Sequence, residues 1–436
     1  MGKSSCVVAP TILNAGYAFK RGERFSMFIN DPKGEHWHST SAWLRSLGMR
    51  TIPWNSHGVE GIPIQNPQIL DAISKSIQED QGLDAEEFAD SFIKAIVPEP
   101  SGGAGDNLWV TQGAQRLGKA LGIYMGGFMP DHCHLVSLYQ LAMEDLERLN
   151  FIASQMQSRD ACRGMFRAQG NSLRNMLDPG FRKTFMTYLS ELQEHVKIYS
   201  DSSAWAPTLT ANDFTIPELF DGKTVVYCIM PGSKSFTHSA YPSLGTTAVI
   251  EGFARHPNPS PLLMINDEMG NLSIPANTLK SALSLLPGYG GGLRMFNFFQ
   301  SYHQAWAKGE EVGKLLIDQS SLHMAFGIGR DLEATEQWAK RCGKTTRKDA
   351  SFRQNSLEMD YSMEKTHSEK EEPIMSETEI ARMPDHEALV WQSGGHGVFK
   401  VSLVPYWRIH EFRAVAGSNP CERGGYPSGE NAIYHL

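Results

Sequence analysis

Two adjacent carboxylates, Asp267 and Glu268, directly follow the sequence Leu-Leu-Met-Ile-Asn at residues 262–266. A short apolar run that ends in acidic residues is typical of a buried parallel strand, and open α/β sheets bind ligands at the carboxyl edge of such strands. Hydrolysis of a nucleoside triphosphate needs two carboxylates there, one for the water shell of Mg²⁺ and one to polarise the attacking water. A solvated strand end is the simpler alternative.

The first residues of the chain could bind phosphate. Gly2, Lys3 and Ser4 match the second half of the phosphate-loop pattern G-x-x-x-x-G-K-[ST], whose backbone N–H groups surround a β-phosphate. In such a loop Lys3 would contact the β- and γ-phosphates, and Ser4 would ligate Mg²⁺. The first glycine of the pattern and the strand before it are absent, and a polar, frayed terminus is the alternative.

Two further polar groups follow predicted strands. Residues 25–30 form an apolar strand pattern that runs into Asp31-Pro32-Lys33-Gly34-Glu35, and Gln300-Ser301 closes the pattern at residues 293–299. In this order the motifs resemble those of the type IV secretion coupling proteins, the ATPases of conjugal DNA transfer. Shorter family-like stretches lie at residues 107–109, 326–327, 342–346, 383–390 and 404–406, so the resemblance extends from Gly2 to Phe412.

The resemblance implies an α/β fold, namely a RecA-like P-loop nucleotide-binding domain with an inserted all-α domain. We expect the first part of the nucleotide-binding domain at residues 1–84, the all-α insertion at 85–205, the second part at 206–416 and a tail at 417–436. Helical periodicity without strand-like alternation between residues 85 and 200 agrees with this division. The polar, charged stretch 344–372 is predicted to be a mobile surface loop or partly disordered.

The resemblance also implies ATP and Mg²⁺ as cofactors, and roles for individual residues. Glu268 would orient and deprotonate the attacking water, and Gln300 would contact the γ-phosphate, although a polar strand cap is the alternative for Gln300. The implied ligands are Gly2, Lys3, Ser4 and Asp31 for the nucleotide, and Ser4 and Asp267 for the metal. For Asp31 and Lys33, shaping the loop is an equally good explanation.

Two departures from the family pattern leave hydrolysis of ATP by this chain open. The phosphate loop is incomplete, and Tyr289 stands where relatives carry an arginine that could act between ring subunits. Loss of such an arginine typically costs ~10³-fold or more in turnover. Arg294 or Arg330 could substitute for it, although a surface charge is an equally good explanation for Arg294.

Composition narrows the class of protein. The 436 residues carry a net charge of −8, which argues against a free-standing module for duplex DNA. The six cysteines show no C-x-x-C spacing, so we expect reduced thiols, and a structural role for His132-Cys133-His134 rather than a metal site. Apolar runs stay short of the ~20 residues that span a bilayer. Because the family carries membrane helices before its phosphate loop, the chain is expected to be amino-terminally truncated.

The resulting hypothesis is an ATP-dependent coupling protein at the cytoplasmic face of the bacterial inner membrane. It would form a homo-oligomeric ring, a hexamer by resemblance, and be anchored through the missing amino-terminal segment. Its cargo would be a relaxase bound to single-stranded DNA, or secreted effector proteins, which it would pass to the components of a type IV secretion channel. The alternative is a degenerate docking or adaptor relative that does not hydrolyse ATP.

Overall fold

The computed structural model describes residues 2–100, 107–353, 364–395 and 397–420, and it divides into two compact units. The small unit comprises Met1–Val7, Ser301–His303 and Ser320–Pro405. The large unit comprises Val8–Gln300, Gln304–Gln319 and Tyr406–Leu436. Most of the predicted tail at 417–436 lies outside the described residues.

The large unit is built on a parallel sheet of five strands in the order β2-β3-β1-β4-β5. Its strands are β1 (Ser26–Asp31), β2 (Arg50–Trp54), β3 (Thr224–Ile229), β4 (Leu262–Asn266) and β5 (Leu293–Asn297). Every residue of β1 and β3 is buried, as expected for central parallel strands, whereas β5 is partly exposed. The predicted α/β class is confirmed.

Helices cover both faces of this sheet. Because side chains alternate along a strand, Met27 and Ile29 of β1 enter one core cluster and Phe28 enters another. The first cluster contains residues of α1 (Ala9–Lys20) and α2 (Glu35–Ser46), and the second contains residues of α11 (Ala240–Arg255) and α12 (Ala276–Ser284). Helices α2, α11 and α12 also connect successive parallel strands, which such pairs require.

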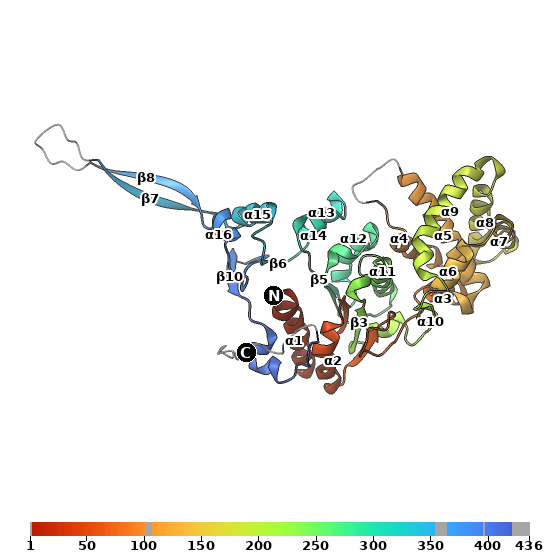
Figure 1. Cartoon of the computed structure of the whole chain (residues 1–436), viewed down its shortest axis with the longest axis horizontal. Coiled ribbons are helices and arrows are strands. Elements are labelled where there is room, and N and C mark those ends of the chain that lie inside the picture. Colours follow the sequence, from red (N-terminus) through yellow and green to blue (C-terminus); the bar gives the residue numbers. More distant parts are fainter. Residues whose placement is uncertain (1, 101–106, 354–363, 396, 421–436) are drawn as a thin grey trace, which may run out of the picture. The chain divides into compact units, whose positions relative to one another are not determined.

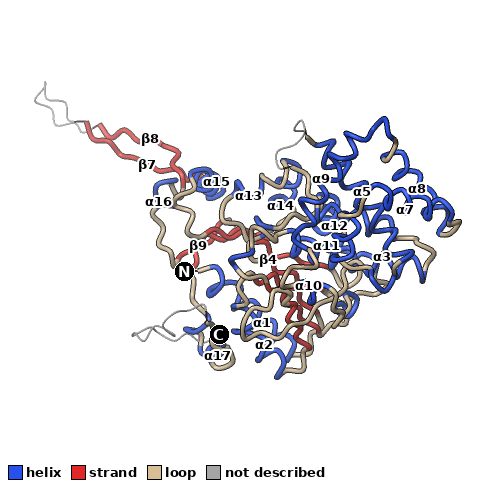
Figure 2. The backbone as a smooth tube through the Cα atoms, turned by 45° about the vertical axis from the view of Figure 1, so that its right-hand side comes forward, coloured by secondary structure: helices blue, strands red, loops and turns tan. Residues whose placement is uncertain are grey.

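A helical insertion separates β2 from β3 along the chain. It consists of α3 (Asp71–Glu79), α4 (Ala85–Ile96), α5 (Leu108–Phe128), α6 (Leu135–Ala142), α7 (Leu146–Ser158), α8 (Met165–Met176), α9 (Arg182–Val196) and α10 (Ala206–Leu209), with short 3₁₀ turns between them. Figure 2 shows helices and loops but no strand among the described residues of this part. The predicted all-α character is therefore confirmed. In the described part of the chain, no helix is long and apolar enough to cross a membrane.

The small unit contains an antiparallel sheet in the order β10-β9-β6. Its strands are β6 (Leu322–Ala325), β9 (Glu387–Gln392) and β10 (Val398–Ser402). Helices α15 (Leu332–Cys342) and α16 (Glu377–Ala381) contribute Trp338 and Ile380 to a core cluster with Leu389 of β9.

A charged ribbon extends from α15 and α16 (Figure 1). It consists of the antiparallel strands β7 (Lys344–Arg353) and β8 (Glu364–Pro373), so the prediction of a mobile surface loop was wrong for these residues, while the part of it at 354–363 lies outside the described residues. Low apolar content misled the prediction, because the backbone hydrogen bonds of an antiparallel pair leave no apolar pattern in the sequence. Opposite charges also meet across it, with Lys344 3.3 Å from Glu371.

A row of asparagine side chains crosses the sheet near the carboxyl ends of its strands. Asn30 of β1, Asn266 of β4 and Asn297 of β5 lie side by side in register. Asn30 Nδ2 donates to Asn266 Oδ1 at 2.8 Å, and Asn266 Nδ2 donates to Asn297 Oδ1 at 2.7 Å. Asn266 is fully buried, and its two hydrogen bonds link three strands, the one with Asn30 away from water.

We expect Asn266→Ala to lower the free energy of unfolding by about 1–3 kcal/mol, because buried amide groups lose their partners. Chemical denaturation measures the change. Asn14→Ala, at an exposed position of α1, is the matched control and should change stability by at most about 0.5 kcal/mol. Equal stability of the two variants would show that the row contributes nothing to the fold.

Candidate functional site

Asp31, the last residue of β1, shapes the turn into α2. Its Oδ2 accepts a hydrogen bond from the backbone N–H of Trp37 at 2.9 Å, and so satisfies a donor in the first turn of α2. Gly34 has φ +72°, and a Cβ there would lie 2.5 Å from Ile62 Cδ1. These contacts support the loop-shaping explanation for Asp31. Burial raises the pKa of Asp31 to about 6, against the opposing effect of His36.

Asp267 and Glu268 follow β4 immediately, at the same edge of the sheet. Asp267 is buried, whereas Glu268 is partly exposed. Glu268 has φ +70° and ψ 53°, a left-handed conformation that costs a residue other than glycine about 1–2 kcal/mol. Asn271 Nδ2 donates to Glu268 Oε2 at 3.0 Å. A strained backbone that is held in place in this way is typical of functional positions.

The loop after Glu268 is attached to the chain that follows β5. The backbone N–H of Met269 donates to Phe298 O at 2.9 Å. Lys308 Nζ donates to Gly270 O at 2.9 Å and also to Leu272 O. Burial lowers the pKa of Lys308 to about 8. The loop that carries Glu268 is therefore held by backbone and side-chain contacts together.

Gln300 lies three residues beyond β5, beside the loop of Glu268. Its side chain is exposed, and its backbone N–H donates to Gln304 Oε1 at 2.8 Å. The Gln304 side chain in turn lies against Gly270, where an added Cβ would come within 2.6 Å of it. The structure thus brings Asp31, Asp267, Glu268 and Gln300 to one edge of one sheet.

The predicted phosphate-loop residues Gly2, Lys3 and Ser4 belong to the small unit. Lys3 and Ser4 are the first two residues of the π-helix η1 (Lys3–Val8) and are partly exposed. The backbone N–H of Cys6 donates to Gly2 O at 2.8 Å. The first turn of η1 contains no acidic residue, which suits the binding of an anion.

Sequence alone did not single out Glu35 and His36, which lie in the first turn of α2. His36 Nε2 is 3.5 Å from Asp267 Oδ2, and both side chains are buried. Burial by itself lowers the pKa of His36, but the carboxyl groups of Asp31, Asp267 and Glu35 together raise it above its ordinary value. Their position in the sequence could have indicated them, because both residues lie shortly after Asp31, at the predicted end of the first strand.

The two candidates for a substituting arginine, Arg294 and Arg330, belong to different units. Tyr289 and Arg294 are at the amino end of β5, opposite to Gln300 along the strand. Tyr289 Oη donates to His256 O at 3.2 Å, and Arg294 Nη1 donates to Pro287 O at 2.7 Å. Arg330 is exposed and precedes α15 in the small unit.

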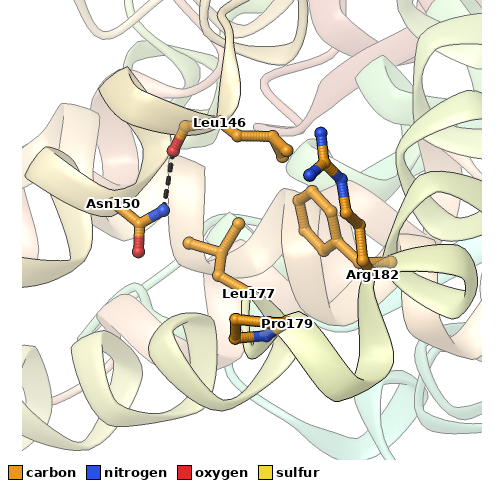
Figure 3. Close-up of a pocket in the computed structure, with 6 residues that line it drawn as sticks. Leu146, Asn150, Leu177, Pro179 and Arg182 are labelled. Atoms are coloured by element: carbon orange, nitrogen blue, oxygen red, sulfur yellow. Dashed lines mark hydrogen bonds between the residues drawn. The ribbon is translucent and has the colours of Figure 1, made fainter.

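The helical insertion contains a pocket of about 320 Å³ between α7, α8 and α9 (Figure 3). It is lined by Leu146, Asn150, Leu177, Pro179, Arg182 and Phe185. Asn150 Nδ2 donates a hydrogen bond to Leu146 O at 2.9 Å. Arg182 is the charged residue of the lining. The lining residues all belong to the helical insertion and include no carboxylate, so the pocket is distinct from the edge of the sheet described above.

Both a family model and solved structures match this chain. The family model described as "Type IV secretory system Conjugative DNA transfer" matches residues 1–420. The chain belongs to this family. Membership of the conjugative DNA-transfer family places the protein among the coupling proteins of type IV secretion and confirms the resemblance seen in the sequence. A search of the curated proteins finds no match.

Solved structures of the coupling protein TrwB share the fold. The unbound monoclinic form of TrwBdeltaN70 matches with a TM-score of 0.65 and 15% identity, over 92% of this chain and 83% of that chain. TrwB in complex with the GTP analogue GDPNP matches with a TM-score of 0.62 and 16% identity, over 92% and 84%. TrwB in complex with ADP and Mg²⁺ matches with a TM-score of 0.56 and 15% identity, over 87% and 85%. At this identity the likeness shows the fold alone, which is RecA-like with an all-α domain.

Proposed function

We propose that this protein is an ATP-dependent coupling protein that hydrolyses MgATP to drive cargo through a type IV secretion channel. The observation that supports this proposal best is the meeting of Asp31, Asp267, Glu268 and Gln300 at the carboxyl edge of β1, β4 and β5. Open α/β sheets bind ligands at that edge, and phosphoryl transfer depends on charged groups that are positioned there in advance.

Each residue has a role in the proposed reaction. Asp267 holds the water shell of Mg²⁺, for which its carboxylate oxygens are suitable ligands. Glu268, whose backbone is left-handed, accepts a proton from the attacking water. Gln300 contacts the γ-phosphate, and Lys3 and Ser4 bind phosphate and metal. The structures of TrwB with ADP and Mg²⁺, and with the ATP analogue ADPNP, make ATP and Mg²⁺ the natural cofactors to propose.

The helical insertion is the proposed cargo-recruiting part. Its partners would be a relaxase–single-stranded DNA complex or secreted effector proteins, and its pocket beside Arg182 offers an apolar floor with one positive charge. The protein would act as a homo-oligomeric ring at the cytoplasmic face of the inner membrane and deliver cargo to channel components.

Binding of a non-hydrolysable ATP analogue with Mg²⁺ tests the nucleotide part of this proposal. We expect Lys3→Ala to weaken binding about ten- to hundredfold, because a hydrogen bond to a charged group contributes about 1.5–3 kcal/mol. Calorimetric titration of the full chain measures the effect. Lys20→Ala, at the exposed end of α1, is the matched control and should bind like the parent protein.

A second candidate function, a docking relative without hydrolysis, is supported by Tyr289 in place of the usual arginine. Analogue binding that depends on Lys3, together with no release of phosphate from ATP, would favour this candidate. If the parent protein and Lys3→Ala bind the analogue equally well, Lys3 has no phosphate-loop role in either candidate function.

A further inference from the structure

Four titratable side chains gather at the junction of β1, β4 and α2 in the large unit. Asp31 and Asp267 follow Asn30 and Asn266, which are neighbours in register on adjacent strands. Glu35 and His36 form the first turn of α2, which the Asp31 side chain caps. Relative exposure is 0% for Asp31, 8% for Glu35, 1% for His36 and 5% for Asp267, so water does not screen these groups.

The charges of this cluster are not balanced by its own members. It contains three carboxyl groups and one imidazole, and burying ionised carboxylates costs several kcal/mol each unless a positive charge compensates them. The groups that act electrostatically on Asp31 are His36, Glu35 and Asp267. Asp31 Oδ1 is buried and has no hydrogen-bond partner among the described residues. A cation held by its neighbours would compensate the buried negative charge of the cluster, including that of Asp31.

The spacing of these side chains suits a metal ion. One ligand atom each from Glu35, His36 and Asp267 lie within 4.8 Å of one another. The 3.5 Å between His36 Nε2 and Asp267 Oδ2 exceeds the usual 2.7–3.2 Å range of a hydrogen bond. Two ligands of a tetrahedral ion, each at ~2.1 Å from the metal, are ~3.4 Å apart. Small movements would therefore bring three ligand atoms to one ion, with the fourth position left to water.

We propose that Glu35, His36 and Asp267 directly bind a divalent transition-metal ion, in preference to Mg²⁺ and without a nucleotide. An imidazole nitrogen suits Zn²⁺ and similar ions, whereas Mg²⁺ takes oxygen ligands and keeps its waters. The site goes beyond the proposed function, in which Asp267 acts on Mg²⁺ only through water. A carboxylate has two oxygens, so Asp267 can serve both roles, with Oδ2 toward His36.

Metal titrations of the full chain without nucleotide test the proposal. Electron paramagnetic resonance should show one Mn²⁺ bound per chain, displaced by equimolar Zn²⁺ but not by a large excess of Mg²⁺. Glu35→Gln and His36→Gln should each weaken Zn²⁺ binding at least about tenfold. Even the loss of a group that only hydrogen-bonds to a metal ligand typically lowers metal affinity by about that factor or more. His38→Gln, on the same helix but outside the cluster, is the matched control and should bind as the parent does.

Several results would overturn the proposal. The first is the absence of stoichiometric Mn²⁺ or Zn²⁺ binding. The second is displacement of Mn²⁺ by Mg²⁺ as readily as by Zn²⁺. The third is a loss of Zn²⁺ affinity in His38→Gln equal to that in His36→Gln. In the first case the His36 imidazolium would be the compensating cation. Should a variant not fold, the melting temperature of the parent decides, because a metal held by the folded state must raise it and a chelator must reverse the shift. Phosphate release with Mg²⁺ alone is measured separately, so failure of the metal site and failure of the ATPase are distinguishable.

Discussion

Glu268→Gln is expected to slow steady-state ATP hydrolysis by about 10²–10⁴-fold, the usual contribution of a general base. Glutamine has nearly the same shape but its amide cannot accept the proton of the attacking water. The hydrogen bond from Asn271 Nδ2 can still be accepted by the side-chain oxygen, so the loop after β4 should keep its conformation. Phosphate release at saturating MgATP measures the rate, and analogue binding should stay within a few-fold of the parent.

Glu310→Gln is the matched control for this substitution. Glu310 is an exposed residue of α14 (Glu310–Asp318) that pairs with Lys314 one turn away. Its loss should leave the rate unchanged. A Glu268→Gln enzyme as fast as the parent would show that another group activates the water, whereas a parent protein without any phosphate release would favour the docking function.

Trp54→Ala should lower the free energy of unfolding by about 3–5 kcal/mol, a large part of a typical margin of ~5–15 kcal/mol. Trp54 ends β2 and is 1% exposed. Its ring meets Phe28 of β1 edge-on at 6.2 Å, and its Nε1 donates to Tyr241 Oη at 2.8 Å. Helix α11 comes so close that a Cβ on Gly245 would lie 2.7 Å from the ring. The substitution thus leaves a cavity between the sheet and α11.

Trp109→Ala provides the comparison. Trp109 is a residue of α5 with 49% exposure, so its removal opens no internal cavity and should cost about 1 kcal/mol or less. Denaturant unfolding of both variants separates the two cases. A Trp54→Ala protein that is as stable as Trp109→Ala would mean that the surrounding side chains collapse into the space, and that the packing around β2 is looser than described.

Much of the site could be predicted because its signals are local. The triplet Ile-Asn-Asp occurs at residues 29–31 and again at 265–267, each time at the end of an apolar run. An apolar run that stops at a polar residue marks a strand end, whatever the rest of the fold does. The charged ribbon of β7 and β8 escaped prediction because backbone pairing, rather than an apolar pattern, makes it.

Sequence by itself determined which residue types stand at the strand ends, the order of the motifs along the chain and the helical character of the insertion. Only the tertiary structure decided which strand ends are neighbours. Because β1 pairs with β4, Asn30 meets Asn266. For the same reason His36 Nε2 of α2 lies 3.5 Å from Asp267 Oδ2, although the two residues are far apart along the chain. Strand order results from packing the helices on both faces of the sheet, and no local pattern records it.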